Sequence, residues 1–352
     1  MRRMPVVARA GALVAGSLFA ALLAAPVSWA QTVDGPRVEW KMATWGKPRA
    51  FTAGMETLAS HVKERTGGKF TITIGYESFG GPKEILDILS VGGLEMTSIC
   101  SSYHPDKHPA YTALDLPFLP LPSFDIQEQV HETFHKHPYI VTEMKKWNAQ
   151  FYMSNLLPQY EFMGRGKPPK TIADFKGMRV RAIGGIGEAM RRLGAVPTSV
   201  DATEVYTIME RGAVDAASFP STYAHAAYKL HEVSKWWTEN MSPGTQACPS
   251  LINVNAWAKL PEQYKKLFDE AKPLAYAALK KAYAVADEKN LKTFKEKGIE
   301  FVKYGDAELA EFRKIGAQPV WDSWVQEMSA KGIPAKELLD LILNTSKSAG
   351  KS

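Results

Sequence analysis

Two successive runs of alternating strands and helices constrain the fold of this 352-residue chain more than any other feature of its sequence. In the first run, alternating apolar residues at 38–42 and 70–74 and a buried apolar stretch at 94–100 are typical of strands. Apolar residues at helical spacing in 51–63 and 85–89 place a helix after each of the first two strands. This β-α-β-α-β order predicts an α/β unit with a largely parallel sheet.

The second run repeats this order after a strand expected at 151–156. Its elements alternate along the following residues: strands at 178–182, 197–200 and 213–219, and helices at 186–193 and 202–211. The last third is rich in Ala, Lys and Glu, with helices expected at 261–297, 309–315, 319–331 and 335–343. Two such units in succession predict an α/β fold with two lobes, a ligand cleft between them and long C-terminal helices.

These elements also predict how the chain is divided between the lobes. Residues 31–157 form the first lobe, to which part of 250–300 returns. Residues 158–249 form the second lobe, on which part of 300–345 packs. The polar residues 346–352 are expected to form a flexible tail.

The first thirty residues have the pattern of a secretory signal peptide, which predicts a periplasmic location. A positive start at Arg2, Arg3 and Arg9 is followed by an apolar run and by small residues at 28–30 before Gln31. The alternative, a membrane anchor, requires a longer apolar run. Removal of three arginines lowers the net charge from +6 to +3, too small a value to indicate binding to nucleic acid.

The cysteines and histidines give no sign of a metal site. Because exported proteins can keep disulfides, Cys100 and Cys248 either form a bridge or are two separate buried residues. No Cys/His spacing resembles a zinc site. His131 and His135 are four residues apart, as in a metal pair, but the charged residues around them fit a solvated helix face. We predict no metal and no cofactor.

The sequence carries none of the common catalytic motifs. It has no G-x-S-x-G elbow, phosphate-binding loop, H-E-x-x-H pair or dinucleotide fingerprint. We therefore expect that the protein is not an enzyme. A periplasmic enzyme acting on an organic acid is a distant alternative, with Glu161 and His225 as its only acid and base candidates.

The strand expected at 178–182 carries Arg181 at its end, shortly before Gly184 and Gly185. From the residues alone, Arg181 either solvates an exposed face of the sheet or waits for an anion. The glycines allow close approach of a ligand, and the N-terminus of the following helix favours negative charge. Arg179, earlier on the same strand, is expected to be a surface residue.

A longer pattern surrounds this arginine. Residues 173–181 read Ala-Asp-Phe-Lys-Gly-Met-Arg-Val-Arg, and Gly-Ala-Val-Pro, Glu-Val-Tyr and Gly-Ala-Val-Asp follow at 194–197, 204–206 and 212–215. The pattern resembles the substrate-binding proteins of TRAP transporters, the tripartite ATP-independent periplasmic carriers. Members of that family show D-L-K-G-L-K-I-R, then G-A-x-P, then E-x-Y-x-A-L-x-x-G-x-V-D-G. Further landmarks of the family lie at 79–81, 93–96, 116–119 and 260–261.

The resemblance covers nearly the whole exported chain and implies a periplasmic binding protein fold. In that family two lobes close over a small organic acid, which is passed to the membrane subunits of the transporter. It implies a monomer with no enzymatic activity. The arginine at the end of the first motif pairs with the substrate carboxylate, and Arg181 occupies the matching position. A planar guanidinium fits a carboxylate through two parallel hydrogen bonds.

Two departures from the family pattern bear on the substrate. Sialic-acid-binding members have a second arginine twenty residues before the first, where this chain has Glu161, so a clamp of two arginines is absent unless Arg165 supplies it. Glu161 either accepts a hydrogen bond from a hydroxyl or ammonium group of the ligand or faces solvent. Phe219 replaces the Asn that many members carry before Pro220. Ser218 and Phe219 together replace the Glu-Trp pair of metal-using relatives.

Aromatic residues recur at the expected cleft positions. Together with one arginine clamp they predict a monocarboxylate with an aromatic or otherwise apolar body. A C4-dicarboxylate or a sugar acid is the alternative within the same family. The predicted substrate-binding residues are Arg181, Phe219, Glu161, Tyr160, Ser218, Tyr223, Trp45, Phe79 and Tyr103.

Overall fold

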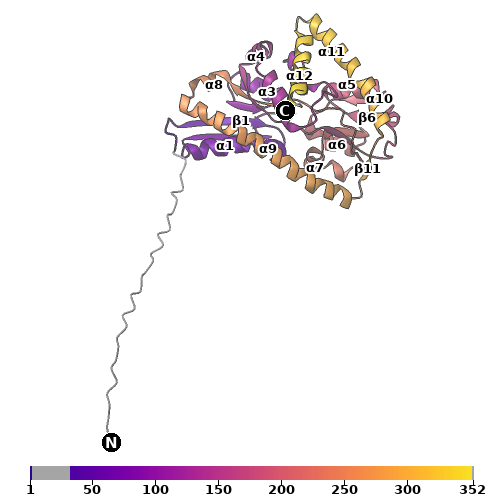
Figure 1. Cartoon of the computed structure of the whole chain (residues 1–352), viewed down its shortest axis with the longest axis horizontal. Coiled ribbons are helices and arrows are strands. Elements are labelled where there is room, and N and C mark those ends of the chain that lie inside the picture. Colours follow the sequence, from indigo (N-terminus) through magenta and orange to yellow (C-terminus); the bar gives the residue numbers. More distant parts are fainter. Residues whose placement is uncertain (2–31, 351–352) are drawn as a thin grey trace. The chain divides into compact units, whose positions relative to one another are not determined.

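The computed structural model describes Met1 and residues 32–350. The signal peptide predicted at 1–30 therefore lies, apart from Met1, outside the described residues. Within residues 32–350 the chain forms two β-sheets with helices packed around them (Figure 1). In this part of the chain no helix is both long enough and apolar enough to cross a bilayer.

The first sheet has five strands in the order β2-β1-β3-β10-β4. Their bounds are β1 Val38–Thr44, β2 Phe70–Tyr76, β3 Met96–Ser98, β4 Ala149–Ser154 and β10 Pro249–Asn253. β1 pairs in parallel with β2 and β3, as the sequence predicted. β10 lies antiparallel to β3 and β4, so the sheet is mixed rather than largely parallel. The sequence did not predict β10, because all five of its residues are buried and show no alternation.

The second sheet has six strands in the order β11-β9-β5-β8-β6-β7. Their bounds are β5 Tyr160–Gly164, β6 Arg179–Arg181, β7 Val196–Thr198, β8 Ala216–Pro220, β9 Trp236–Thr238 and β11 Glu300–Val302. β6 pairs in parallel with β7 and β8, and β9 with β11, whereas β5 is antiparallel to β8 and β9. The sequence missed β5, β9 and β11, which are short and, in β5 and β9, wholly buried.

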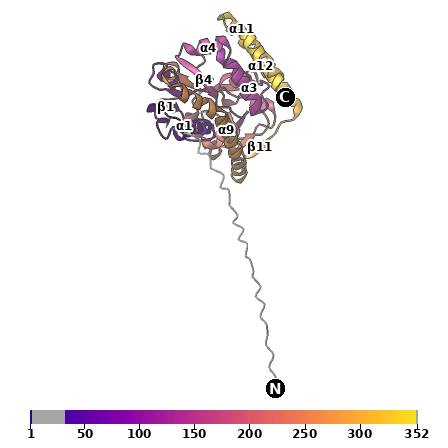
Figure 2. The same cartoon turned by 60° about the vertical axis from the view of Figure 1, so that its left-hand side comes forward.

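Three segments pass from one sheet to the other. β4 leads to β5, β9 leads to β10, and helix α9 (Glu262–Glu296) runs past both sheets (Figures 1 and 2). At 1.5 Å per residue, α9 is about 50 Å long. It packs on α1 (Ala53–Arg65) and α7 (Tyr223–Ala227). Its Phe268 ring contacts Trp40 of the first sheet, and its Phe294 ring contacts Trp237 of the second.

Most of the predicted helices are present within a few residues of their expected bounds. The other α-helices are α2 Ile85–Ser90, α3 Phe124–Phe134, α4 Pro138–Lys145, α5 Gly184–Arg192, α6 Val205–Glu210, α8 Val254–Lys259, α10 Asp306–Gly316, α11 Gln318–Ala330 and α12 Ala335–Ala349. The flexible tail expected from residue 346 is wrong for 346–349, which continue α12. Ser346 is buried there, and its hydroxyl donates to the carbonyl of Pro120.

Two apolar clusters form the core of the described chain. The larger one lies between the sheets and their helices and includes Phe70, Phe162 and Trp236. The smaller one includes Tyr111 and Leu338, and it holds α12 against α3.

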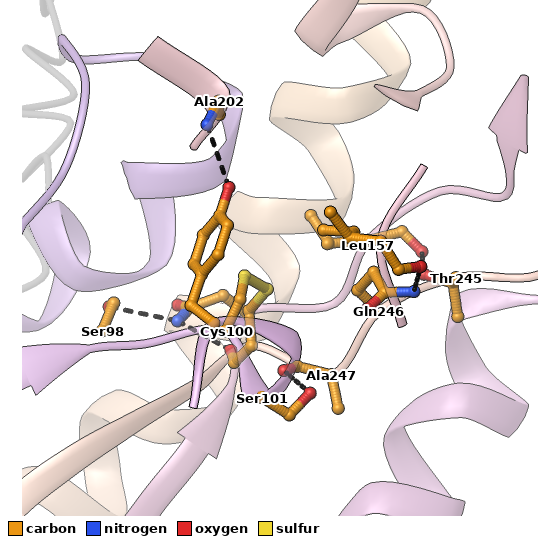
Figure 3. Close-up of a disulfide and its surroundings, with 12 residues drawn as sticks. Ser98, Cys100, Ser101, Leu157, Ala202, Thr245, Gln246 and Ala247 are labelled. Carbon is orange, nitrogen blue, oxygen red and sulfur yellow. Dashed lines mark hydrogen bonds between the residues drawn. A yellow bond between two sulfur atoms is a disulfide. The ribbon is translucent and has the colours of Figure 1, made fainter. Parts of the chain in front are cut away.

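Cys100 and Cys248 form a disulfide, which decides between the two alternatives left open by the sequence (Figure 3). Cys100 follows β3, and Cys248 precedes the antiparallel strand β10. Hydrogen bonds from Ile99 N–H to the Pro249 carbonyl and from Ser101 N–H to the Ala247 carbonyl continue the ladder on both sides of the bridge. The disulfide therefore fixes the end of the β9–β10 connection to the first sheet.

Candidate ligand-binding cavity

A small cavity lies where strands of both sheets end. β1 and β3 of the first sheet and β6 and β8 of the second lead into it at their carboxyl ends, the usual place for ligands in α/β sheets. Its walls are Trp45, Arg49, Phe51, Cys100, Tyr103, Leu157, Tyr160, Arg181, Ile183, Ala202, Phe219, Pro220, Tyr223, Ala224 and Tyr228. The space between these side chains is about that of one water molecule, so a larger ligand enters only when the walls move apart.

Arg181 ends β6 inside this cavity, with 1% of its surface exposed. Its Nε and Nη2 donate to the carbonyl of Val200 at 3.2 and 3.1 Å, and its Nη1 donates to the carbonyl of Ser218 at 3.0 Å. Its Cζ lies 4.5 Å from the centre of the Phe219 ring, a cation–π contact. The guanidinium forms no ion pair with any carboxylate among residues 32–350.

Tyr103 brings a phenol from the first sheet to this guanidinium. Its hydroxyl accepts from Arg181 Nη2 at 3.3 Å and from Ala202 N–H at 3.1 Å, the second bond being drawn in Figure 3. Burial raises the pKa of the Tyr103 phenol, so the group keeps its proton. Within residues 32–350 that proton has no hydrogen-bond acceptor. Arg181 uses four of its five N–H donations, so both residues can still donate to an anion.

The rest of the wall is mainly aromatic. The rings of Phe219 and Tyr228 stack with centres 5.3 Å apart. Trp45 contacts Phe51 at 5.2 Å and Tyr103 edge-on at 5.9 Å. Such surfaces suit a flat apolar body attached to the anionic group.

Arg49 is a second cation in the cavity, and the sequence analysis missed it. It follows β1, and its Nη1 donates to the carbonyls of Trp45 and Lys47 at 2.7 and 2.9 Å. Its Cζ lies 4.8 Å from the centre of the Phe51 ring. The residue is half-buried in a loop without periodicity, and only the surrounding Trp45 and Phe51 hinted at this position.

Burial and the neighbouring phenols act in opposite directions on Arg49. Burial alone lowers the pKa of the guanidinium, but the phenol groups of Tyr228, Tyr223 and Tyr283 raise it on balance. Arg49 therefore remains positively charged at every pH at which the protein is folded.

Arg165, the sequence-based candidate for a second arginine, is not part of the cavity. Its Nη1 donates to the carbonyls of Met209 and Glu210 at the end of α6. These bonds satisfy carbonyls that a helix end leaves free. Arg179 pairs with Asp215 and is half exposed, in keeping with its expected surface position.

Glu161 is also outside the cavity, contrary to both alternatives given by the sequence. It lies on β5 with 2% of its surface exposed, so it neither faces solvent nor lines the ligand space. Its carboxyl group accepts from the hydroxyl of Thr238, the N–H of Met241 at 3.1 Å, and the N–H and hydroxyl of Ser242 at 2.9 and 3.0 Å. Burial raises the pKa of this carboxyl to about 7, although the donated bonds lower it in part. Glu161 thus holds the start of the β9–β10 connection.

Two further predicted residues do not present their side chains to the cavity. Ser218 contributes only its carbonyl, which accepts from Arg181. Phe79 is partly buried, and its ring lies against Gly75 at the end of β2. Six predicted residues are brought together in the cavity wall: Arg181, Phe219, Tyr160, Tyr223, Trp45 and Tyr103.

The glycines after Arg181 allow the start of α5 to pack closely against the segment before α3. A side chain at Gly185 would collide with the carbonyl of Asp115, so the start of α5 can lie directly against the segment before α3 only because residue 185 is glycine. A salt bridge of 2.9 Å between Lys83 and Asp201 joins the same two sides of the cavity. The expectation that these glycines make room for the ligand is not supported by this geometry.

The histidines named in the sequence analysis form contacts with other side chains rather than with each other as a metal pair. His131 Nδ1 is 2.6 Å from the hydroxyl of Ser154, and His135 Nε2 is 2.8 Å from the hydroxyl of Tyr111. Between residues 32 and 350 no three His, Cys, Asp or Glu side chains lie close enough together to hold a metal ion. His225 contacts the Phe219 ring from behind and does not line the cavity.

Comparison with known proteins identifies a family over most of this length. Residues 44–327 match the bacterial extracellular solute-binding proteins of family 7. The chain is 28% identical over 294 residues to a monocarboxylate 2-oxoacid-binding periplasmic protein of Nostoc sp., covering 80% of this chain and 78% of the relative.

Solved structures share the fold at low sequence identity. A TRAP solute-binding protein from Rhodoferax ferrireducens, in complex with copurified benzoate, has a TM-score of 0.80 at 19% identity and covers 89% of this chain and 99% of its own. A marine metagenome TRAP solute-binding protein specific for aromatic acid ligands, in complex with 3-hydroxybenzoate, has a TM-score of 0.81 at 19% identity and covers 90% and 99%. These similarities confirm the two-lobed fold.

Proposed function

This chain belongs to family 7 of the bacterial extracellular solute-binding proteins, the substrate-binding proteins of TRAP transporters, and from its cavity we propose that it captures an organic monocarboxylate with an aromatic or otherwise apolar body. In this proposal the protein is a periplasmic monomer that delivers the acid to the membrane subunits of its transporter. It binds the acid without transforming it, because neither Glu161 nor His225 reaches the cavity.

The observation that carries the proposal is the buried Arg181 without a counter-ion. A buried charge is costly unless it is paired, and backbone carbonyls supply only partial compensation. A ligand carboxylate provides the missing negative charge and can accept from Arg181 Nη1 and from the Tyr103 hydroxyl. The cavity wall supplies no other acidic group for this purpose.

The aromatic wall supports an apolar body on this carboxylate. The stacked Phe219 and Tyr228 rings, with Trp45 and Phe51 across the cavity, offer surface to a flat ligand. The names of the Nostoc relative and of the two solved structures, which refer to 2-oxoacids, benzoate and 3-hydroxybenzoate, agree with a carboxylate of this kind. A C4-dicarboxylate or a sugar acid remains the second candidate, since it can use the same arginine.

Binding and closure are coupled in this proposal. Arg181 belongs to the second sheet and Tyr103 to the turn that follows β3 of the first sheet, so a carboxylate held by both joins the lobes. The lobes, which we place at residues 31–157 and 158–249, open about the two strand connections and α9 and close on the ligand. Only the closed form presents the outer faces of both lobes together to the membrane subunits.

A thermal-shift screen of the purified protein tests the proposal. The panel contains benzoate and phenylacetate derivatives, aryl 2-oxo acids, C4-dicarboxylates and sugar acids. A ligand that binds only the folded protein raises its Tm by mass action. We expect the largest shifts with the aryl acids, and shifts confined to C4-dicarboxylates or sugar acids would refute the apolar-bodied ligand while leaving the transport role intact.

A further inference from the structure

Arg49 and Arg181 enter the same cavity from opposite sides. Arg49 follows β1 of the first sheet, whereas Arg181 ends β6 of the second. Arg49 and Tyr228 also line a wider groove that opens beside the cavity, and Arg181 does not. Arg181 therefore marks the inner end of the ligand space, and Arg49 marks the end nearer the groove.

The polar atoms around Arg49 are incompletely satisfied. Its Nη1 is held by two backbone carbonyls, but its Nε is buried without a hydrogen-bond partner in the described chain. The buried hydroxyl of Tyr228 has no partner there either. Gly46 lies beside both residues, because a side chain at this position would lie 2.9 Å from the Tyr228 hydroxyl and 3.0 Å from Arg49 Nη1. Two unsatisfied polar groups thus converge on the outer end of the cavity.

No described acidic side chain neutralises Arg49. As for Arg181, no carboxylate among residues 32–350 forms an ion pair with it. Each of the two guanidinium groups in this largely apolar cavity therefore lacks a carboxylate partner, which negative charge or strong acceptors placed beside it would supply. A ligand with a single carboxylate supplies an acceptor only to Arg181, at the inner end of the cavity.

We propose that Arg49 is a second anion-binding group of the cavity, and that the ligand is an aromatic acid with an additional oxygen acceptor at the end opposite its carboxylate. This inference rests on the proposed function and narrows its substrate class. The additional group is a phenolic hydroxyl or a second carboxylate that accepts from Arg49 and meets the Tyr228 hydroxyl. The aromatic ring between the two polar ends lies against Phe219 and Trp45.

The test compares matched ligands on matched variants by isothermal titration calorimetry. The ligands are 3- and 4-methylbenzoate, the corresponding hydroxybenzoates, and isophthalate and terephthalate, so that each pair differs only in the acceptor. The variants of the full-length mature protein are Arg49→Met, Arg49→Lys and Lys47→Met. Lys47 is an exposed cation of the same loop, so Lys47→Met controls for the loss of one positive charge.

We expect wild type to bind at least one acceptor-bearing acid about tenfold or more tightly than its methyl counterpart. Arg49→Met should reduce this preference to within about threefold, by weakening the acceptor-bearing acid more than the methylbenzoate, whereas Lys47→Met should keep the preference. If Arg49→Met binds no acid, the result for Arg49→Lys decides whether Arg49 is an anion-binding group. If Arg49→Lys again prefers the acceptor-bearing acid, the inference is supported. If Arg49→Lys binds only the methylbenzoate, the inference is overturned.

Other outcomes separate this inference from the proposed function. Equal affinity of wild type for methyl and acceptor-bearing acids would overturn the role of Arg49 and leave the aryl-acid proposal standing. So would a preference that survives in Arg49→Met. Failure of wild type to bind any acid in the panel would overturn the proposed function and this inference with it.

Discussion

Two buried charged residues of the second sheet, Arg181 and Glu161, show how differently one fold can use burial. Glu161 accepts four hydrogen bonds from the segment 238–242 and does not line the cavity. Arg181 keeps one N–H unused, has a phenol beside it with an unused proton, and faces a cavity. Both residues are ionisable and inaccessible, but only Arg181 has an unused donor. Incomplete polar pairing beside a cavity, rather than burial or charge, is the basis on which we place the ligand at Arg181.

The largest expected effect is a loss of stability when the hydrogen bonds of Glu161 are removed. Glu161→Ala leaves four buried donors without an acceptor, so we expect the free energy of unfolding to fall by about 3 kcal/mol or more. Affinity of the folded protein for its ligand should change by less than about threefold, because Glu161 does not line the cavity. Urea unfolding and calorimetry measure the two quantities. Thr238→Val, which removes one of the four donors, should cost about 1 kcal/mol.

The opposite result for Glu161 is equally informative. A large loss of affinity with normal stability would show that Glu161 reaches the ligand in solution. The contrast drawn from hydrogen-bond saturation would then be wrong.

The second prediction concerns the disulfide between Cys100 and Cys248. It fixes the end of the β9–β10 connection, whereas Glu161 holds the start of this connection. Cys100→Ser combined with Cys248→Ser removes a crosslink that closes a loop of 148 positions, so we expect a loss of about 2–4 kcal/mol in unfolding free energy. Because Cys100 also lines the cavity, affinity should fall as well, by about three- to tenfold. The reduced wild-type protein is the control and should match the double variant. Unchanged stability on reduction would contradict a structural role for the bridge.

Arg181 should show the reverse of the Glu161 behaviour. Arg181→Lys keeps the charge and loses the planar fork, so we expect ligand affinity to fall about 10- to 100-fold. Stability without ligand should change by less than about 1 kcal/mol, because the buried charge is retained. Calorimetry and urea unfolding again provide both values, with Arg179→Lys at the exposed start of the same strand as the control. Wild-type affinity in Arg181→Lys would remove this arginine from the site.

The sequence predicted the order of the helices and strands better than it predicted the residues of the cavity. Apolar periodicity located β1, β2 and most helices, because these elements have a buried face and a more exposed one. It also located β6, although Val180 and Arg181 are both buried. Strands β5, β9 and β10 are buried on every side, so their composition holds no alternation to read. The alternation at 178–182 placed Arg181 correctly at the end of a strand.

The errors at the site have a common physical cause. Glu161 meets Thr238 and Ser242, which lie some eighty positions later in the chain, so no local pattern could show that its hydrogen bonds are already satisfied. Arg49 and Arg181 likewise come from different lobes and meet only through the fold. A sequence motif identifies a residue type at a position, but saturation of its partners is a property of the assembled structure.

The smallest expected effect concerns pH, and it compares Glu161 with His225, which lies behind Phe219. Burial raises the pKa of Glu161 to about 7 and lowers the pKa of His225 to about 3. Between about pH 4.5 and 7, Glu161 binds a proton only in the folded state, so its contribution to stability is present below this range and is lost as pH rises. Between about pH 3 and 6.5, His225 binds a proton only in the unfolded state, so its contribution is present above this range and is lost as pH falls.

These opposite signs give a direct test by urea unfolding between pH 5 and 6.5. Relative to wild type, the unfolding free energy of Glu161→Gln should increase with pH, and that of His225→Phe should decrease, each by up to about 1.4 kcal/mol per pH unit. Parallel pH curves for wild type and both variants would show that neither group differs in protonation between the folded and unfolded states. Curves that diverge as expected would confirm that folding raises the proton affinity of the Glu161 carboxyl at the β9–β10 connection and lowers that of the His225 ring.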